Sequence, residues 1–327
     1  MKLGVIGAGR IGQLHAETLA LRVPGAQLVG VADIHRTAAQ TLAERHGAAV
    51  MEAEALLASV DAVVIASSTD SHATFIEAAA AAGRHIFCEK PVDLSLERID
   101  QALQAVAEAG VTLQVGFNRR FDPNFAHVQQ QVRQGGVGDV HLVRITSRDP
   151  GPPPLDYVRV SGGLFLDMTI HDFDMARFLA GEVTHVQATG AVRVDPAIGE
   201  AGDIDTAVVV LEHTSGAITT IDNSRKAIYG YDQRVEVFGS GGMVWAENNS
   251  AHRTGLADGA GLHAPRPLDF FMDRYTESYV RELTAFVQCV RDGSEPPVTG
   301  ADGRAPVVIG LAAQRSMAEG RRVAIPW

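Results

Sequence analysis

Three glycines near the amino terminus constrain the fold of this chain more than any other feature. Gly7, Gly9 and Gly12 have the spacing G-x-G-x-x-G, which follows an apolar run at residues 3–6 and precedes a helical pattern at residues 11–21. In such a setting the first glycine allows a tight turn, the second lets the backbone approach a pyrophosphate, and the third lets the helix pack closely on the strand. The pattern therefore predicts a strand–turn–helix unit that holds a dinucleotide at the helix N-terminus.

An acidic residue lies where such a unit contacts the adenosine ribose. Asp33 ends the next apolar run, residues 28–32, and follows Gly12 at about the 20-residue offset of a ribose-binding carboxylate. A carboxylate there bonds the 2′-hydroxyl of NAD and repels the 2′-phosphate of NADP, so we expect NAD as the cofactor and NADP to be disfavoured. Arg10 and Arg36 oppose this preference, because either guanidinium could reach a phosphate. The alternative is a glycine-rich turn with an acid nearby by chance.

Composition excludes several classes of protein. The 327 residues suffice for about two domains, and 46% are hydrophobic, which is enough for a packed core. The net charge of −11 argues against nucleic-acid binding, which needs a basic surface. No apolar run approaches the roughly 20 residues of a membrane span, and no signal sequence is apparent. The two cysteines, Cys88 and Cys289, indicate neither a disulfide framework nor a zinc site. We therefore expect a cytoplasmic protein without a metal, a membrane or a nucleic-acid partner.

The pattern of elements divides the chain into two parts. Up to Arg119, short runs rich in valine and isoleucine alternate with alanine-rich helical patterns, which predicts a parallel sheet covered by helices on both faces. After that residue come a helix, a strand, a proline-rich loop, a helix at residues 164–180 and four successive strand-like stretches. We expect an α/β nucleotide domain at residues 1–119 and an α+β substrate domain at 120–327, with an antiparallel or mixed sheet. Whether the last helix packs on the first domain stays open.

A lysine follows the strand expected at residues 85–88. Lys90 lies at the carboxyl end of a parallel strand, which is the edge where ligands bind on such sheets, and Pro91 restricts it to an extended conformation. An ordinary surface turn is the alternative for this Glu-Lys-Pro triplet. A rigid lysine beside a nucleotide-binding loop favours a role in catalysis.

A carboxylate and a histidine form a second candidate cluster. Asp167 and His171 are four residues apart, and on one continuous helix they would share a face. Histidine suits proton transfer near neutral pH, and a nearby carboxylate orients it and stabilises its charged form. The alternative is a structural histidine paired with an acid, and these two residues alone favour it slightly. A metal site is disfavoured, because His171, Asp172 and Asp174 do not share a helical face.

Together with the glycine motif, three further motifs resemble the Gfo/Idh/MocA oxidoreductases: Cys88-Glu-Lys-Pro91, Gly116-Phe-Asn-Arg-Arg-Phe-Asp122 and Asp167-x-x-x-His171. The resemblance extends over nearly the whole chain and is strongest towards the inositol 2-dehydrogenases of that family. It implies a Rossmann domain with a parallel sheet, followed by a domain with a large, open, mostly antiparallel sheet. It also implies a homo-oligomer, a dimer or a tetramer, that pairs through this sheet. An exposed sheet face needs a cover, so the physical expectation agrees.

The resemblance implies roles for individual residues. It makes Lys90 and His171 the catalytic pair, with Asp167 as the third member. The residues that we expect to contact the cofactor are Gly7, Gly9, Arg10, Ile11, Gly12, Asp33, Arg36, Ser67, Thr69, His72, Glu89 and Lys90. The residues that we expect to contact a small polyol substrate are Lys90, Asn118, Arg119, Asp156, Asp167, His171 and Tyr231.

The activity that we expect is NAD-dependent oxidation of a secondary alcohol of a cyclic polyol, with myo-inositol, oxidised to its 2-keto form, as the best candidate. His171 would accept the hydroxyl proton, Lys90 would stabilise the developing alkoxide, and Asp167 would orient His171. The alternatives are a dehydrogenase of scyllo-inositol or another sugar, a glycosidase that uses tightly held NAD, and a non-catalytic NAD-sensing regulator. The joint presence of the three side chains argues against the regulator.

Overall fold

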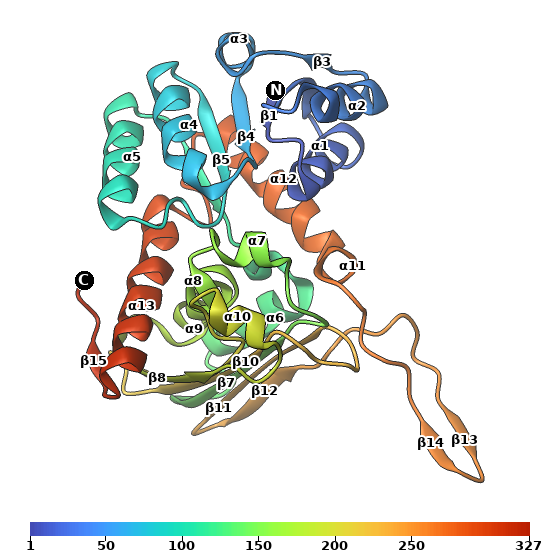
Figure 1. Ribbon diagram of the computed structural model, residues 1–327, viewed down its shortest axis with the longest axis vertical. Coiled ribbons are helices and arrows are strands. Elements are labelled where there is room, and N and C mark those ends of the chain that lie inside the picture. The colour runs from blue at the N-terminus through green and yellow to red at the C-terminus, as the bar shows by residue number, and fades with distance from the viewer. The chain divides into compact units, whose positions relative to one another are not determined.

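The computed structural model describes residues 1–327 and divides them into two units. The first contains residues 1–121 and 277–307, and the second contains residues 122–276 and 308–327. A single cut between residues 119 and 120 therefore does not separate the two units, because residues 277–307 belong to the first. Figure 1 shows the elements of each unit, coloured along the chain.

A six-stranded parallel sheet forms the centre of the first unit, with the strand order β3-β2-β1-β4-β5-β6. The strands are β1 (Lys2–Ile6), β2 (Gln27–Ala32), β3 (Ala49–Val50), β4 (Ala62–Ile65), β5 (His85–Glu89) and β6 (Leu113–Gly116). β4 is buried along its whole length, as a parallel sheet covered by helices requires. The strand order reverses between β1 and β4, and ligands of such folds bind beyond the carboxyl ends of the strands at this switch point.

Helices connect these strands. They are α1 (Arg10–Leu21), α2 (Arg36–His46), α3 (Ala53–Ser59), α4 (Thr69–Ala81) and α5 (Leu96–Ala109), followed by the 3₁₀ helix η1 (Asn118–Phe121). The unit also takes up α12 (Thr276–Asp292) from residue 277 and the start of α13 (Gly300–Glu319). Leu283, Phe286 and Val287 of α12 are buried in the core cluster that contains Leu3 and Val5 of β1. This burial explains why residues distant in sequence belong to the first unit.

A seven-stranded mixed sheet forms the second unit, with the order β12-β11-β7-β10-β9-β8-β15. The strands are β7 (Val140–Arg148), β8 (Val183–Ala191), β9 (Thr206–His213), β10 (Ile218–Ser224), β11 (Asp232–Gly239), β12 (Gly242–Ala246) and β15 (Val323–Ala324). β7 and β10 pair in parallel, and the other neighbours pair antiparallel. The predicted mixed, mostly antiparallel sheet is thereby confirmed.

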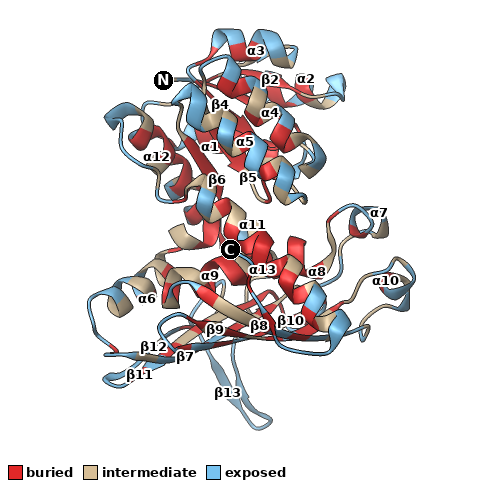
Figure 2. Cartoon of the chain, turned by 90° about the vertical axis from the view of Figure 1, so that its left-hand side faces the viewer, coloured by how far each residue is buried: buried red, intermediate tan, exposed pale blue.

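Helices lie over one face of this sheet, and the other face is open (Figures 1 and 2). The helices of the second unit are α6 (Pro123–Arg133), α7 (Leu155–Val158), α8 (Gly163–Asp167), α9 (Ile170–Ala180), α10 (Pro196–Glu200) and α11 (Phe271–Arg274), with the end of α13. In β7, buried Val143 and Ile145 alternate with exposed Leu142 and Arg144, as expected for a sheet with one covered face. None of the helices in either unit combines the length and hydrophobicity that crossing a bilayer requires.

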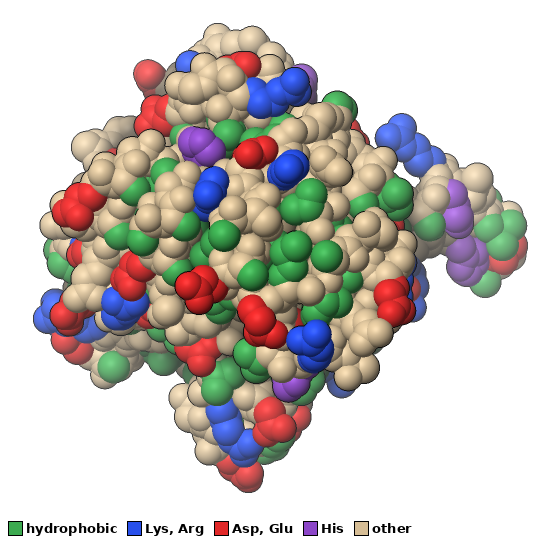
Figure 3. Space-filling model, turned by 90° about the horizontal axis from the view of Figure 1, so that it is seen from above, with side chains coloured by type: hydrophobic (Ala, Val, Ile, Leu, Met, Phe, Trp, Pro, Cys, Tyr) green, Lys and Arg blue, Asp and Glu red, His purple; other side chains and the backbone are tan.

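A two-stranded ribbon, β13 (Leu256–Asp258) and β14 (Gly261–His263), projects from the second unit (Figure 1). Residues 251–264 are all exposed, and Figure 3 shows histidine and hydrophobic side chains on the surface of the ribbon. The sequence did not predict these strands, because a ribbon with no buried face carries no alternating hydrophobic pattern.

Candidate active site

The glycine loop between β1 and α1 has the shape that its motif predicts. Gly7 has a φ of +104°, and a Cβ there would lie 2.4 Å from the Ala66 carbonyl oxygen. A Cβ on Gly12 would lie 1.9 Å from the Gly7 carbonyl oxygen, so the helix approaches the strand as closely as the backbone permits. Gly9 instead faces open space and begins α1 without a side-chain cap. The space beside Gly9 and the uncapped helix start therefore fit a pyrophosphate.

Asp33 lies directly beside this loop. Its Oδ2 accepts a hydrogen bond from the Ala8 backbone N–H at 2.6 Å, and its Oδ1 accepts one from the His35 backbone N–H at 2.6 Å. These bonds fix the carboxylate just beyond β2, where the motif expects a ribose. Arg36, one of the two cations that oppose a preference for NAD, pairs with Glu52 at 3.3 Å, and both side chains are exposed. The negative charge of Glu52 thus partly offsets the positive charge of Arg36.

Three residues that we expected to contact the cofactor lie in the loop from β4 to α4 and in the first turn of α4. Ser67 Oγ hydrogen-bonds Ser71 Oγ at 2.7 Å, and Thr69 is the first residue of α4. His72 is buried, and both of its ring nitrogens face backbone carbonyls: Nδ1 faces Pro91 at 2.8 Å and Nε2 faces Ser67 at 3.1 Å. The ring thus lies between this loop and the segment after β5, and the predicted contact of His72 with a cofactor stays a prediction.

Lys90 follows β5, beyond the carboxyl end of a central parallel strand, where the sequence predicted it. Its backbone N–H donates to Glu89 Oε2 at 3.3 Å. Glu89 Oε1 lies 2.6 Å from Nε2 of His15, a buried residue of α1. The peptide bond from Lys90 to Pro91 is cis. The strand end that carries the lysine is therefore tied to the first helix of the nucleotide domain.

In the second unit, two side chains that the sequence did not identify hold Asp167. The Tyr157 hydroxyl donates to Oδ1 at 2.9 Å, and Arg225 Nη1 donates to Oδ2 at 2.9 Å. Arg225 is 3% exposed and also faces Asp149 at 3.7 Å. Burial acts to lower the pKa of Arg225, but the charges of the two aspartates outweigh it and the net direction is upward. The guanidinium therefore stays charged and favours an ionised Asp167.

Asp167 and His171 do not share one helix. α8 ends at Asp167 and α9 begins at Ile170, so the single helix predicted over residues 164–180 is wrong. The two side chains come from the last residue of one helix and the first turn of the next. Their relative placement therefore depends on the break between the helices, and the four-residue spacing of a continuous helix does not set it.

A buried threonine holds this break. The Thr169 N–H donates to the Leu164 carbonyl at 3.0 Å, and its Oγ1 donates to Asn223 Oδ1, on β10, at 2.7 Å. Asn223 Nδ2 in turn donates to Asp172 Oδ2 at 2.8 Å. This chain of buried hydrogen bonds fixes the first turn of α9, which carries His171. Nothing in the local sequence indicates it, because Asn223 lies 54 residues from Thr169.

Three further candidates for substrate contact are buried. Asn118 and Arg119 belong to η1 in the first unit. Tyr231 precedes β11 in the second unit, where its ring packs edge-on against Tyr275 with 6.0 Å between ring centroids. A polar side chain in such surroundings needs hydrogen-bond partners, which protein groups or a ligand can supply.

Asp156, the predicted substrate contact in the proline-rich segment, and its neighbour Tyr157 have different surroundings. The Asp156 side chain is 99% exposed and pairs with Arg159 at 3.1 Å. Its neighbour Tyr157 reaches Asp167. Both residues belong to α7, a helix of four residues that is too short to show a periodic pattern by which sequence analysis could choose between them.

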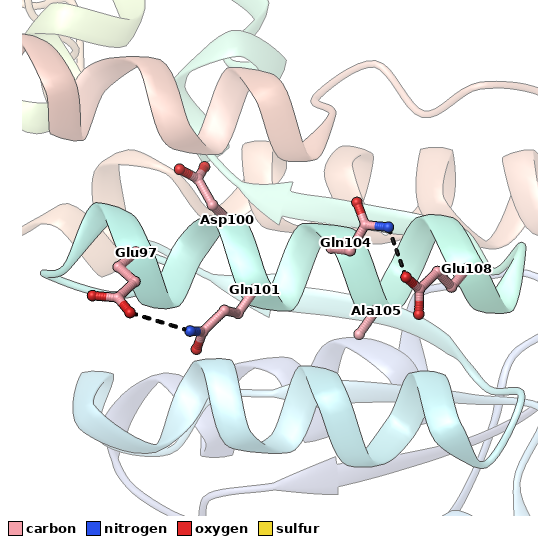
Figure 4. A pocket seen from close by; sticks show the side chains of 6 residues that line it. All are labelled: Glu97, Asp100, Gln101, Gln104, Ala105 and Glu108. Atoms are coloured by element: carbon pink, nitrogen blue, oxygen red, sulfur yellow. Dashed lines mark hydrogen bonds between the residues drawn. The ribbon is translucent and has the colours of Figure 1, made fainter.

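A shallow surface hollow of about 640 Å³ lies along α5 (Figure 4). All six residues that line it come from this one helix: Glu97, Asp100, Gln101, Gln104, Ala105 and Glu108. Its polar groups bond one another along the helix, Gln101 to Glu97 at 3.4 Å and Gln104 to Glu108 at 2.7 Å. An exposed helix face of this kind is a solvated surface, and we assign no site to it.

In a comparison with known proteins, two family models match two successive parts of the chain. Residues 1–117 match the model of an oxidoreductase family with an NAD-binding Rossmann fold, and residues 125–245 match the GFO/IDH/MocA C-terminal domain. A myo-inositol 2-dehydrogenase from Thermotoga maritima is 48% identical over 99% of this chain and 98% of its own length. A scyllo-inositol 2-dehydrogenase (NAD(+)) from Bacillus subtilis is 36% identical over 99% of this chain and 96% of its own.

Solved structures show the same likeness. A myo-inositol dehydrogenase from Corynebacterium glutamicum has a TM-score of 0.96 and 37% identity, covering 100% of this chain and 99% of its own. One from Lactobacillus casei, solved in complex with NAD(H) and myo-inositol, has a TM-score of 0.89 and 26% identity, covering 100% of this chain and 97% of its own.

The glycine loop and Asp33 lie where the strand order of the parallel sheet reverses. Together with the match to the family model, they define an oxidoreductase with an NAD-binding Rossmann domain. The chain belongs to the Gfo/Idh/MocA oxidoreductase family.

Proposed function

We propose that this protein catalyses the NAD-dependent oxidation of myo-inositol to its 2-keto form. The observation that carries the proposal is the full-length identity of 48% to a myo-inositol 2-dehydrogenase, in a chain that has the lysine, aspartate and histidine motifs of its family. A non-catalytic regulator would not need these three side chains together.

The proposed preference for NAD over NADP rests on Asp33. Its carboxylate is fixed beside the glycine loop by two backbone N–H groups, so it cannot turn away from a ribose without losing both hydrogen bonds. A 2′-phosphate there would face this negative charge. Arg36 would have to leave Glu52 before it could compensate.

The catalytic roles divide between the two units of the chain. When bound, the nicotinamide supplies the acceptor for the carbon-bound hydride. His171, in the second unit, takes the hydroxyl proton, and Lys90, in the first unit, donates a hydrogen bond to the developing alkoxide. Asp167 holds its charge through Tyr157 and Arg225, and this charge favours the imidazolium that proton transfer creates.

The proposed substrate contacts are Asn118, Arg119, Asp167 and Tyr231. A polyol presents hydroxyls around the whole ring, and a site that hydrogen-bonds them discriminates against isomers that leave a buried partner unpaired. Each unpaired group costs about 1–3 kcal/mol, so an isomer that fails one contact should react at least about fivefold less efficiently. Asp156, which points into solvent, is a weaker candidate than Tyr157.

Oxidation of scyllo-inositol is the second candidate, because the relative from Bacillus subtilis carries that name at 36% identity. The test is a panel of myo-inositol, scyllo-inositol and aldoses, with NAD or NADP, read by the absorbance of the reduced nicotinamide. We expect the highest kcat/KM for myo-inositol with NAD. A higher value for scyllo-inositol or an aldose overturns the substrate and leaves the reaction class, and no cofactor reduction with any polyol overturns both.

We also propose that the protein is a homo-oligomer, a dimer or a tetramer, that pairs through the open face of the second sheet. On this face Leu142 is in register with Ile218 of β10 and with Phe238 of β11, which in turn faces Met243 of β12. All four side chains are exposed, although they form one apolar row across four strands. Such a row is stabilised when a second copy covers it.

A further inference from the structure

A buried cluster of three ionisable side chains lies beneath Lys90, entirely within the first unit. It consists of His15 on α1, Glu89 at the end of β5 and Glu282 on α12, and one nitrogen or oxygen atom from each lies within 4.8 Å of those of the other two. His15 and Glu282 are both fully buried. Neither the glycine motif nor the proposed proton transfer accounts for His15 and Glu282.

The surrounding elements are shaped to hold the cluster. The His15 ring packs edge-on against Phe87, at 5.2 Å, and Tyr279, at 5.8 Å. Gly116 of β6 leaves room for the Glu89 carboxyl group, because a Cβ there would lie 3.2 Å from its Cδ and Oε2. Two helices, α1 and α12, and two strands, β5 and β6, thus meet around the His15 ring and the Glu89 carboxylate.

Glu282 is the group whose state the geometry decides. Both of its carboxyl oxygens are buried and have no hydrogen-bond partner in the protein. The groups that face it are Glu89 and His15, with Tyr279 on its own helix and Gln114 of β6, whose Nε2 donates to the Glu282 backbone carbonyl at 2.9 Å. Neither carboxyl oxygen is paired with a lysine or an arginine, so the ionised form would place a buried negative charge beside a second carboxylate.

Burial raises the pKa of Glu282 well above the ordinary glutamate value, and the charge of Glu89 raises it further. Both effects favour the neutral carboxylic acid form of Glu282 over the ionised form. Both carboxyl oxygens of Glu89 have a partner: Oε1 lies 2.6 Å from His15 Nε2, and Oε2 accepts a hydrogen bond from the Lys90 N–H at 3.3 Å.

We propose that His15, Glu89 and Glu282 form a proton-holding cluster that positions Lys90 for catalysis. His15 donates an N–H to one oxygen of Glu89. Glu282 stays neutral, so that no second negative charge repels the Glu89 carboxylate. Glu89 in turn fixes the backbone of Lys90. His15 and Glu282 are positioning residues that act through Glu89, and the inference rests on the proposed catalytic role of Lys90.

The same three side chains could offer a histidine and two carboxylates to a metal ion. The donor set argues against this occupant, because a metal ion needs ionised ligands and both Glu282 oxygens lie in a site that favours the protonated form. Metal analysis of the purified protein distinguishes a metal site from a proton-holding cluster. We expect no stoichiometric metal, and one equivalent that is lost in His15→Leu overturns the proton-holding cluster.

The first test replaces His15. His15→Leu removes the donor to Glu89, whereas His15→Gln keeps an N–H at a similar reach. Because a small misplacement of a catalytic group costs up to about 100-fold, we expect kcat with myo-inositol to fall about tenfold or more in His15→Leu, with KM for NAD changed less than about threefold, and to recover in His15→Gln. Thr18→Val, at another buried polar residue of α1, is the matched control and should keep the wild-type kcat.

A second test reads the proton directly and does not need activity. The infrared spectrum of the wild-type protein at neutral pH should contain the carbonyl band of a buried, protonated carboxylic acid, and Glu282→Gln should lack it. Glu282→Gln, which is neutral and of the same shape, should keep kcat within about threefold of the wild type, since only charge displacement is costly. Absence of the band, or a His15→Leu variant with unchanged kcat, overturns the cluster.

The outcome for Lys90→Ala separates this inference from the proposed function. If Lys90→Ala keeps its kcat, the catalytic role of the lysine is wrong and the inference falls with it. If Lys90→Ala loses activity while His15→Leu does not, the inference alone is overturned.

Discussion

At the scale of single residues, the carboxyl groups of Asp33, Asp167 and Glu282 differ in the neighbours that they contact. Two backbone N–H groups hold Asp33, and a tyrosine and a buried arginine hold Asp167. Glu282 has neither kind of partner, and burial raises its pKa well above the ordinary glutamate value. We therefore propose three different roles for a carboxyl group: a ribose acceptor at Asp33, a charged partner of His171 at Asp167 and a neutral acid at Glu282.

Replacing Asp33 by serine tests its role in cofactor choice. Asp33→Ser removes the negative charge beside a 2′-phosphate, so the ratio of kcat/KM for NADP to that for NAD should rise at least about tenfold, or about 1.4 kcal/mol. Steady-state kinetics with both cofactors measures the ratio. Asp61→Ser is the control, because Asp61 also accepts a backbone N–H, that of Lys2 at 2.7 Å, without facing the glycine loop. An unchanged ratio in Asp33→Ser contradicts the assignment.

The raised pKa of Glu282 predicts how the free energy of unfolding depends on pH. The pKa of this group is higher in the folded state, so above about pH 4.3 the unfolded chain releases a proton that the folded chain keeps. The wild type should therefore lose about 1.4 kcal/mol of unfolding free energy per pH unit, relative to Glu282→Gln, until the folded group ionises. Urea unfolding of both proteins across this range measures the difference. A difference that does not grow with pH contradicts the raised pKa.

At the scale of elements, the sequence predicts the first unit well and the second only in outline. Buried strands such as β4 read as continuous apolar runs, and their alternation with helical patterns identifies the parallel sheet. The strands β7 to β11 were also found, since one covered face gives them an alternating pattern. The exposed ribbon β13–β14 has no such pattern and was missed.

The candidate site divides in the same way. Gly7, Gly12 and Asp33 could be placed because the motif itself requires their geometry. Arg225 could not, because it lies 58 residues from Asp167 and meets it only through the fold. The break between α8 and α9 was missed for the same reason, since a distant asparagine holds it.

The helix break predicts the effect of removing one hydroxyl. Thr169→Val keeps the shape of the side chain but leaves the buried Asn223 Oδ1 without its donor, which should cost about 1–3 kcal/mol of unfolding free energy. Thr169→Ser, which keeps the hydroxyl, should lose less. Chemical denaturation of the two variants beside the wild type measures both. Equal losses in valine and serine variants would show that the hydroxyl does not hold the break.

At the scale of the whole molecule, the residues of the proposed function are distributed over both units. The first has the glycine loop and Lys90, and the second has Asp167 and His171. The second unit also carries the open sheet face, whose apolar row has no cover within its own unit. We therefore expect assembly to depend on the second sheet and cofactor choice to depend on the first.

A charge in the apolar row tests the proposed assembly. Phe238 lies in the middle of the row, between Leu142 and Met243, so Phe238→Asp places a charge where a partner would bury it. Light scattering should show a smaller species than for the wild type, because stable interfaces exclude unpaired charges. Leu21→Asp, at an exposed leucine of α1, should leave the mass unchanged. A Phe238→Asp variant with the wild-type mass contradicts pairing through this face.

The most direct test of the central claim follows the hydride itself. With myo-inositol deuterated at C2 and NAD, mass spectrometry should find the deuterium in the nicotinamide of the reduced cofactor. His171→Ala should slow this transfer by about 10²–10⁴-fold, the usual contribution of a general base, while His127→Ala, at an exposed histidine of α6, should not. Reduced cofactor without deuterium, or transfer at an unchanged rate in His171→Ala, would contradict the account.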